Sequence, residues 1–78
     1  MSTQRKKDPL YRTSDVIWSN IRKFQYLNRI SDEQLACLLD VSVRTLDNYD
    51  SEPQRITLKT IENFTRETGT PTENLLII

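Results

Sequence analysis

The chain carries its apolar residues in short groups spaced three or four residues apart, with polar residues between them. In the stretch 31–52, Leu35 and Leu39 are four apart, and Leu46 and Tyr49 are three apart. This spacing predicts two short helices, each with one apolar face, and we expect the two faces to pack on each other. The stretch, SDEQLACLLDVSVRTLDNYDSE, therefore predicts a helix-turn-helix unit.

Polar residues stand where these two central helices need caps. Ser31 and Gln34 match a capping box, in which the serine hydroxyl accepts from the amide three residues on and the glutamine reaches back. The first helix is expected to end near Asp40. Ser42 then supplies a new N-cap for a second helix over about 43–50.

Another helix is predicted on the N-terminal side of this unit. Its N-cap candidates lie at 13–15, it ends near 28–29, and one stripe faces the core: Ile17, Ile21, Phe24 and Leu27. Trp18 lies beside this stripe and is expected to broaden the buried face. Ile30 precedes the next N-cap and is expected to act as a hydrophobic staple.

On the C-terminal side, residues 51–55 are predicted to form a loop because Pro53 lacks a backbone donor. Thr57 then caps a fourth helix, and Gly69 ends this helix in the left-handed conformation. The inward positions predicted for it are Leu58, Ile61, Phe64 and Thr65.

The last residues predict one more short helix. The sequence Thr-Pro-Thr-Glu at 70–73 matches a capping box with proline at the first helical position. A fifth helix is therefore expected to bring Leu75 and Leu76 onto the core. Ile77 and Ile78 allow two interpretations, because they either complete the core or form an exposed apolar patch that pairs two subunits.

Composition narrows the fold class and the chemistry. The single glycine argues against hairpin-rich β structure and phosphate-binding loops, so an all-α fold is expected. Seventy-eight residues make one small domain, which buries roughly 60% of its unfolded surface. With Cys37 as the one cysteine and no histidine, the sequence excludes an intrachain disulfide and the common zinc sites, and no cofactor is expected. The polar N-terminus and the short apolar run at 75–78 predict a soluble, cytoplasmic protein without membrane contact.

The formal charge is zero, but it is unevenly distributed. Residues 1–30 carry seven Lys/Arg and two Asp/Glu, a sum of +5, whereas residues 31–52 carry one arginine and six Asp/Glu, a sum of −5. Residues 53–78 carry three of each. A basic surface is typical of nucleic-acid-binding proteins, so the acidic central stretch needs an explanation.

Residues 1–12 lack helical periodicity and are expected to form a flexible arm before the domain at 13–78. Arg5, Lys6 and Lys7 make this arm basic. It is either a solvated terminus or an arm that follows DNA phosphates or enters a groove.

The span from about 16 to 76 resembles the lambda-repressor-like, Cro/C1-type (XRE family) helix-turn-helix domain. The resemblance is carried by Ile21-Arg22, the run 31–36, Val41-Ser42, Thr45-Leu46, Tyr49-Asp50, Thr57-Leu58, Ile61, Gly69 and the run 73–76. It implies a compact five-helix domain that binds operator DNA as a dimer, with its third helix in the major groove. A protein of this kind is a small phage or prokaryotic transcription regulator, such as a repressor.

The resemblance also implies which residues meet DNA. Those expected at base edges are Val43, Arg44, Asp47 and Asn48. Their side chains offer an aliphatic group for a thymine methyl, a guanidinium for guanine, a carboxylate for cytosine, and an amide for adenine or phosphate. Leu46 and Tyr49 are expected to face the core. Candidates for contacts with the DNA backbone, with simple capping as the alternative for the hydroxyls, are Ser42, Thr45, Ser51, Gln54 and Arg55.

Several residues depart from the family pattern. Asp47 places a carboxylate on the helix that is expected to read DNA, where it either accepts from cytosine N4 or deters non-specific binding. Asp32 stands where glutamine commonly touches phosphate, and its charge would repel phosphate unless it only caps the helix. Arg29 and Asp40 stand at customary glycine positions, although aspartate tolerates the left-handed region.

A protein-binding module is the alternative function. In that case the acidic stretch 31–52 docks on another transcription regulator, as an antirepressor or modulator would. An enzyme is not expected, because the sequence has no histidine, no serine with an evident base and no glycine-rich phosphate loop.

Overall fold

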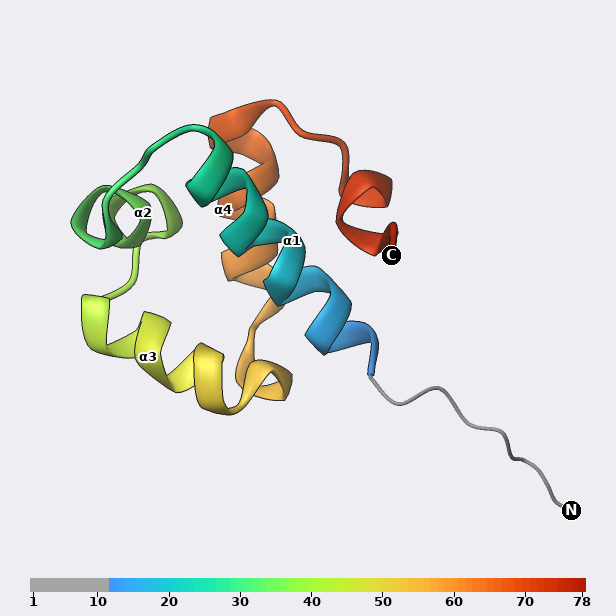
Figure 1. Ribbon diagram of the computed structural model, residues 1–78, viewed down its shortest axis with the longest axis horizontal. Helices are drawn as coiled ribbons and strands as arrows, with labels where there is room; N and C mark the ends of the chain where they lie inside the picture. Colours follow the sequence, from blue (N-terminus) through green and yellow to red (C-terminus); the bar gives the residue numbers. More distant parts are fainter. Residues whose placement is uncertain (1–11) are drawn as a thin grey trace, which may run out of the picture.

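The computed structural model describes residues 12–78, which form four α-helices and two 3₁₀ turns (Figure 1). The helices are α1 (Thr13–Leu27), α2 (Asp32–Leu39), α3 (Val43–Ser51) and α4 (Leu58–Thr68), and the turns are η1 (Pro53–Arg55) and η2 (Thr72–Leu76). These residues contain no strand, so the all-α prediction is confirmed for the part of the chain that the structure describes. None of the described helices combines the length and the apolar character that crossing a membrane requires.

Side-chain caps begin three of the four helices at the predicted residues. The Ser31 hydroxyl accepts from the Gln34 amide at 3.1 Å, and Gln34 Oε1 accepts from the Ser31 amide at 2.9 Å, which completes the capping box of α2. The hydroxyls of Ser42 and Thr57 each accept from the amide three residues on at 3.1 Å. Helix α1 begins slightly earlier than predicted, because the amide of residue 12 donates to the carboxylate of Asp15 at 2.9 Å.

Three of the described residues have positive φ angles, and each stands where the chain leaves a helix. Asp40 ends α2 at φ +60°, Gly69 ends α4 at +73°, and Arg29 follows α1 at +56°. The left-handed ends predicted at Asp40 and Gly69 are confirmed. A residue with a side chain pays about 1–2 kcal/mol for this conformation. At Arg29 and Asp40 the next residue donates its amide back to a helix carbonyl, at 3.0 and 2.9 Å, and so supports the bend.

The core is a single apolar cluster to which all four helices contribute. Its buried members are Trp18, Ile21, Leu35, Ala36, Leu39, Leu46, Tyr49, Phe64 and Leu75. Two edge-to-face aromatic pairs, Trp18 with Tyr49 and Phe24 with Phe64, have ring centroids 5.1 Å apart and join α1 to α3 and α4. The prediction that Trp18 broadens the buried face of α1 is therefore confirmed, and Ile30 packs against the cluster as a staple residue should.

Two leucines predicted to face the core lie outside it. Leu27 is 64% exposed and Leu58 is 77% exposed, because they are the last residue of α1 and the first residue of α4. The inner face of α4 instead buries Thr60 and Asn63. The Thr60 hydroxyl lies 3.2 Å from the tyrosine hydroxyl of α3, and Asn63 Nδ2 donates to the last carbonyl of α2 at 3.0 Å. The other inward positions predicted for α4 are buried or half-buried: Ile61, Phe64 and Thr65.

Where a fifth short helix was expected, the C-terminal segment forms the short 3₁₀ helix η2 rather than an α-helix, and the capping box predicted at 70–73 is wrong. Pro71 precedes the turn without a side-chain cap, and its carbonyl accepts from the Asn74 amide at 3.0 Å. Leu75 is buried, whereas Leu76, Ile77 and Ile78 are exposed and do not complete the core. Residues 51–55 are also more regular than the predicted loop, because residue 51 ends α3 and residues 53–55 form η1.

Candidate nucleic-acid interface

Helix α3 presents one polar face to solvent and one apolar face to the core. Leu46 and Tyr49 are buried, as predicted. The four residues expected at base edges are all exposed: Val43, Arg44, Asp47 and Asn48. They share one side of the helix because they stand at intervals of three and four residues. The structure therefore brings these four candidates together on one solvent-exposed surface of α3.

The candidates for contacts with the DNA backbone fall at the two ends of α3. Ser42 and Thr45 lie at its beginning, where their side-chain oxygens are 2.9 Å apart and the serine caps the helix. At the other end, the Ser51 hydroxyl donates to two carbonyls of its own helix, at 3.4 and 3.2 Å. Arg55 pairs with Glu52 at 3.1 Å. These hydroxyls thus have local partners, as the capping alternative predicts.

The remaining candidates are less constrained or lie elsewhere. Gln54 is exposed on η1. Arg5, Lys6 and Lys7, the candidates on the basic arm, lie outside the described residues.

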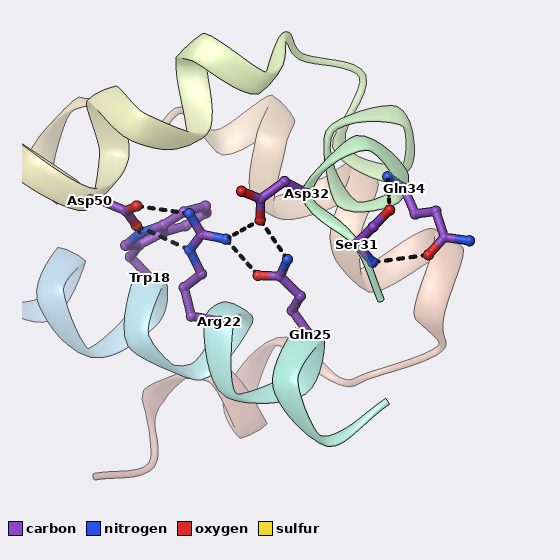
Figure 2. Close-up of polar contacts among 7 residues, drawn as sticks. All are labelled: Trp18, Arg22, Gln25, Ser31, Asp32, Gln34 and Asp50. Carbon is purple, nitrogen blue, oxygen red and sulfur yellow. Dashed lines mark hydrogen bonds and ion pairs between the residues drawn. The ribbon is translucent and has the colours of Figure 1, made fainter. Parts of the chain in front are cut away.

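Arg22 of α1 contacts both α2 and α3 (Figure 2). Its Nε and Nη2 donate to the two carboxylate oxygens of Asp50, at 3.0 and 2.7 Å, and its Nη1 donates to Asp32 at 2.8 Å. The Trp18 indole donates to the same Asp50 carboxylate at 2.7 Å. Gln25 completes the network, since it accepts from Arg22 at 2.6 Å and donates to Asp32 at 2.8 Å.

This network positions α2 and α3 from α1. Asp32 is the first residue of α2, and Asp50 lies in the last turn of α3. One guanidinium thus holds the beginning of one helix and the end of the other. The guanidinium also lies 5.3 Å from the Trp18 ring centroid, a cation–π distance. Asp32 is therefore tied to Arg22 within the protein rather than left to repel a phosphate.

The same contacts shift the pKa values of both carboxyls. Hydrogen bonds from Arg22 and from the Trp18 indole favour the charged form and lower the pKa of Asp50. Hydrogen bonds from Gln25 and Arg22 lower the pKa of Asp32. Both groups are consequently carboxylates at neutral pH.

This network was not predicted from the sequence, although the spacing of three residues on α1 indicates it. Trp18, Arg22 and Gln25 stand at intervals of four and three residues, so they share one face of α1 beside the apolar stripe. Polar side chains beside the apolar stripe of a helix, such as Arg22 and Gln25, indicate a polar contact at the edge of the core. The acidic partners, however, are distant in the sequence.

Ion pairs with basic residues offset much of the acidic charge of residues 31–52. Asp32 and Asp50 pair with Arg22, Glu52 pairs with Arg55, and Asp40 lies 4.0 Å from the amine of Lys59. Four of the six carboxylates thus have a basic partner that comes from outside this stretch. Among residues 12–78, the two acids of the stretch without an ion pair are Glu33 and Asp47.

Comparison with protein-family models, curated proteins and solved structures found no significant match.

Proposed function

We propose that this protein is a small transcription regulator of the phage or prokaryotic type, and that it binds operator DNA with α3 in the major groove. The observation that carries the proposal is the exposed face of α3. Arg44 and Asn48 stand four residues apart on that face, while the opposite face of the same helix is buried in the core. The helix therefore has a rigid support and a free polar surface, which major-groove reading requires.

The side chains on this face suit base edges. Arg44 has no ion pair among the described residues, so its guanidinium is available for the O6 and N7 acceptors of guanine. Asn48 offers an amide that pairs with adenine. Asp47 accepts from cytosine N4 and opposes binding to unrelated sequences, and Val43 contacts a thymine methyl.

Ion pairs within the protein offset much of the negative charge of α2 and α3, so this charge opposes DNA binding less than the count of acidic residues suggests. Arg22, Lys59 and Arg55 partner four of the six carboxylates of residues 31–52. The regulator acts in the cytoplasm as a homodimer, has no catalytic role, and requires no cofactor.

Selection of bound duplexes from a random DNA pool at low salt tests the proposal. We expect an enriched motif, and an affinity for that motif that falls steeply as salt is raised, because phosphate contacts release counterions. The matched control is the Arg44→Ala and Asn48→Ala double variant, which keeps the core and its caps. A folded wild-type protein that enriches no motif would contradict DNA reading by α3.

A protein-binding function is the second candidate, and the two acids without ion pairs favour it. Glu33 and Asp47 are exposed and leave negative charge on the outer surface of α2 and α3. A basic surface of another transcription regulator would complement them. In this case Glu33→Lys with Asp47→Lys abolishes capture of the partner regulator, while Glu62→Lys on α4 does not. Equal capture by both variants would remove this candidate.

A further inference from the structure

The outward face of α1 carries opposite charges at its two ends. Asp15, Ser19 and Lys23 stand at four-residue steps on this face. Lys23 follows Asp15 by eight positions, which corresponds to a rise of about 12 Å along the helix. Among the described residues, Lys23 has no ion pair, and Asp15 pairs within 4.0 Å only with the neighbouring Arg12.

The C-terminal residues lie along the same face as an apolar ridge. Asn20 Nδ2 donates to the carbonyls of Leu75 and Ile77, both at 2.8 Å, and so fixes this segment against α1. The side chains beyond the clamp stay in solvent, because Ile77 is 62% exposed and Ile78 is 86% exposed. Together with Leu76, which is 49% exposed, they place three consecutive exposed apolar residues on the surface, and exposed apolar patches mark sites of interaction.

Hollows flank this ridge on both sides. One, of about 400 Å³, is bordered by Lys23, Phe24 and Leu27, and the other, of about 320 Å³, is bordered by Asp15 and Ser19 among others. Ile77 and Ile78 border both hollows. The surface therefore combines a ridge, hollows beside it, and charges of opposite sign at its ends.

We infer that two copies of this chain pair through the outward face of α1 and the ridge Ile77–Ile78, with the two α1 helices antiparallel. A two-fold axis near Ser19 sets Asp15 against the partner's Lys23, and Lys23 against the partner's Asp15, as an isologous interface requires. The isoleucines of each copy then enter a hollow of the other.

This inference names the dimer surface of the proposed DNA-binding protein, and it rests on that proposal only in making the functional unit a dimer. The pairing leaves α3 uncovered. Both views show the C-terminal segment on the other side of α1 from α3 (Figures 1 and 2). Each copy therefore keeps the exposed face of α3 free for a groove.

Sedimentation equilibrium without DNA, from micromolar to millimolar protein, tests the surface. We expect a wild-type dimer, and a dissociation constant raised about tenfold or more in Asp15→Lys and in Lys23→Asp, because each variant sets two pairs of like charges against each other. Mixing the two variants restores opposite charges at both contacts and should restore the dimer as a heterodimer.

Ile78→Ser provides a second variant, because Asp15 also caps α1 and its replacement lowers helix stability. Ile78→Ser should weaken the dimer without changing the melting temperature that is measured at concentrations where the protein is monomeric, because association itself raises the melting temperature. Leu58→Ser, at an exposed leucine on α4, should change neither. A monomeric wild type, wild-type association in Lys23→Asp or Ile78→Ser, or no heterodimer from two folded variants would overturn the inference. Because these measurements contain no DNA, their failure leaves the operator selection as a separate result.

Discussion

Arg22 and Asp50, which lie 28 residues apart in the sequence, are joined by two hydrogen bonds from one guanidinium to one carboxylate. The pair fixes the last turn of α3 against α1. Because Asp32 binds the same guanidinium, a single side chain of α1 contacts both α2 and α3.

Arg22→Leu should lower the free energy of unfolding by about 1–3 kcal/mol, because it removes the guanidinium that donates to Asp50, Asp32 and Gln25. Chemical denaturation at neutral pH measures the change. The matched control is Arg55→Leu, which removes an exposed ion pair with Glu52 and should change stability by less than about 0.5 kcal/mol. Equal effects of the two substitutions would show that the Arg22 network contributes no more than a surface pair.

Stability should fall in acid because the pKa values of Asp32 and Asp50 are lower in the folded protein than the ordinary value of 3.8. The unfolded chain then binds more protons, so stability is fully present above about pH 4 and is lost as the pH falls through the folded pKa values. Denaturation between about pH 7 and about pH 2 measures this slope. Asp50→Asn should flatten the slope. An unchanged acid slope in Asp50→Asn would contradict the assignment.

Arg44→Ala should weaken binding to the selected DNA site by about 1–3 kcal/mol and relax the preference at one base pair. Stability should stay within about 0.5 kcal/mol of wild type, since Arg44 is exposed. Titration of the selected duplex and of single-base variants measures both effects. Lys59→Ala, at the exposed start of α4, is the control for general loss of positive charge. Full affinity of the Arg44→Ala variant would remove this residue from the interface.

Leu46→Ala should destabilise the fold by about 2–5 kcal/mol, because it leaves a cavity where a fully buried side chain of α3 packs in the core. Leu58→Ala makes the same chemical change at a leucine that is 77% exposed, and should have little effect. Thermal melting of both variants decides the comparison. A native melting temperature in Leu46→Ala would mean that α3 is rotated relative to the arrangement described above.

The sequence predicted the features that are encoded within a few residues. Ser31, Ser42 and Thr57 cap their helices because each hydroxyl meets an amide only three residues away. The left-handed ends at Asp40 and Gly69 are local in the same sense.

Features that depend on partners far along the chain were not predicted. Leu27 and Leu58 fit the apolar periodicity of their helices, but they stand at helix ends and are exposed. Thr60 and Asn63 are buried because a tyrosine hydroxyl and a carbonyl from other helices accept or share their hydrogen bonds. The same distinction holds for the candidate site. The exposure of Arg44 and Asn48 follows from helical spacing, whereas the pairing of Asp32 and Asp50 with Arg22 depends on residues far apart in the sequence.

Helix α3 has nine residues, fewer than an isolated helix needs to persist in water. Its helical conformation therefore depends on the rest of the domain, because the Ser42 hydroxyl caps its first turn and Arg22 binds Asp50 in its last turn. A peptide cut from residues 42–52 would lose both the helix and any specificity that the helix carries. If α3 reads DNA as proposed, substitutions on α1 that contact no DNA should therefore change the sequence that α3 selects, although they lie far from the exposed face of α3.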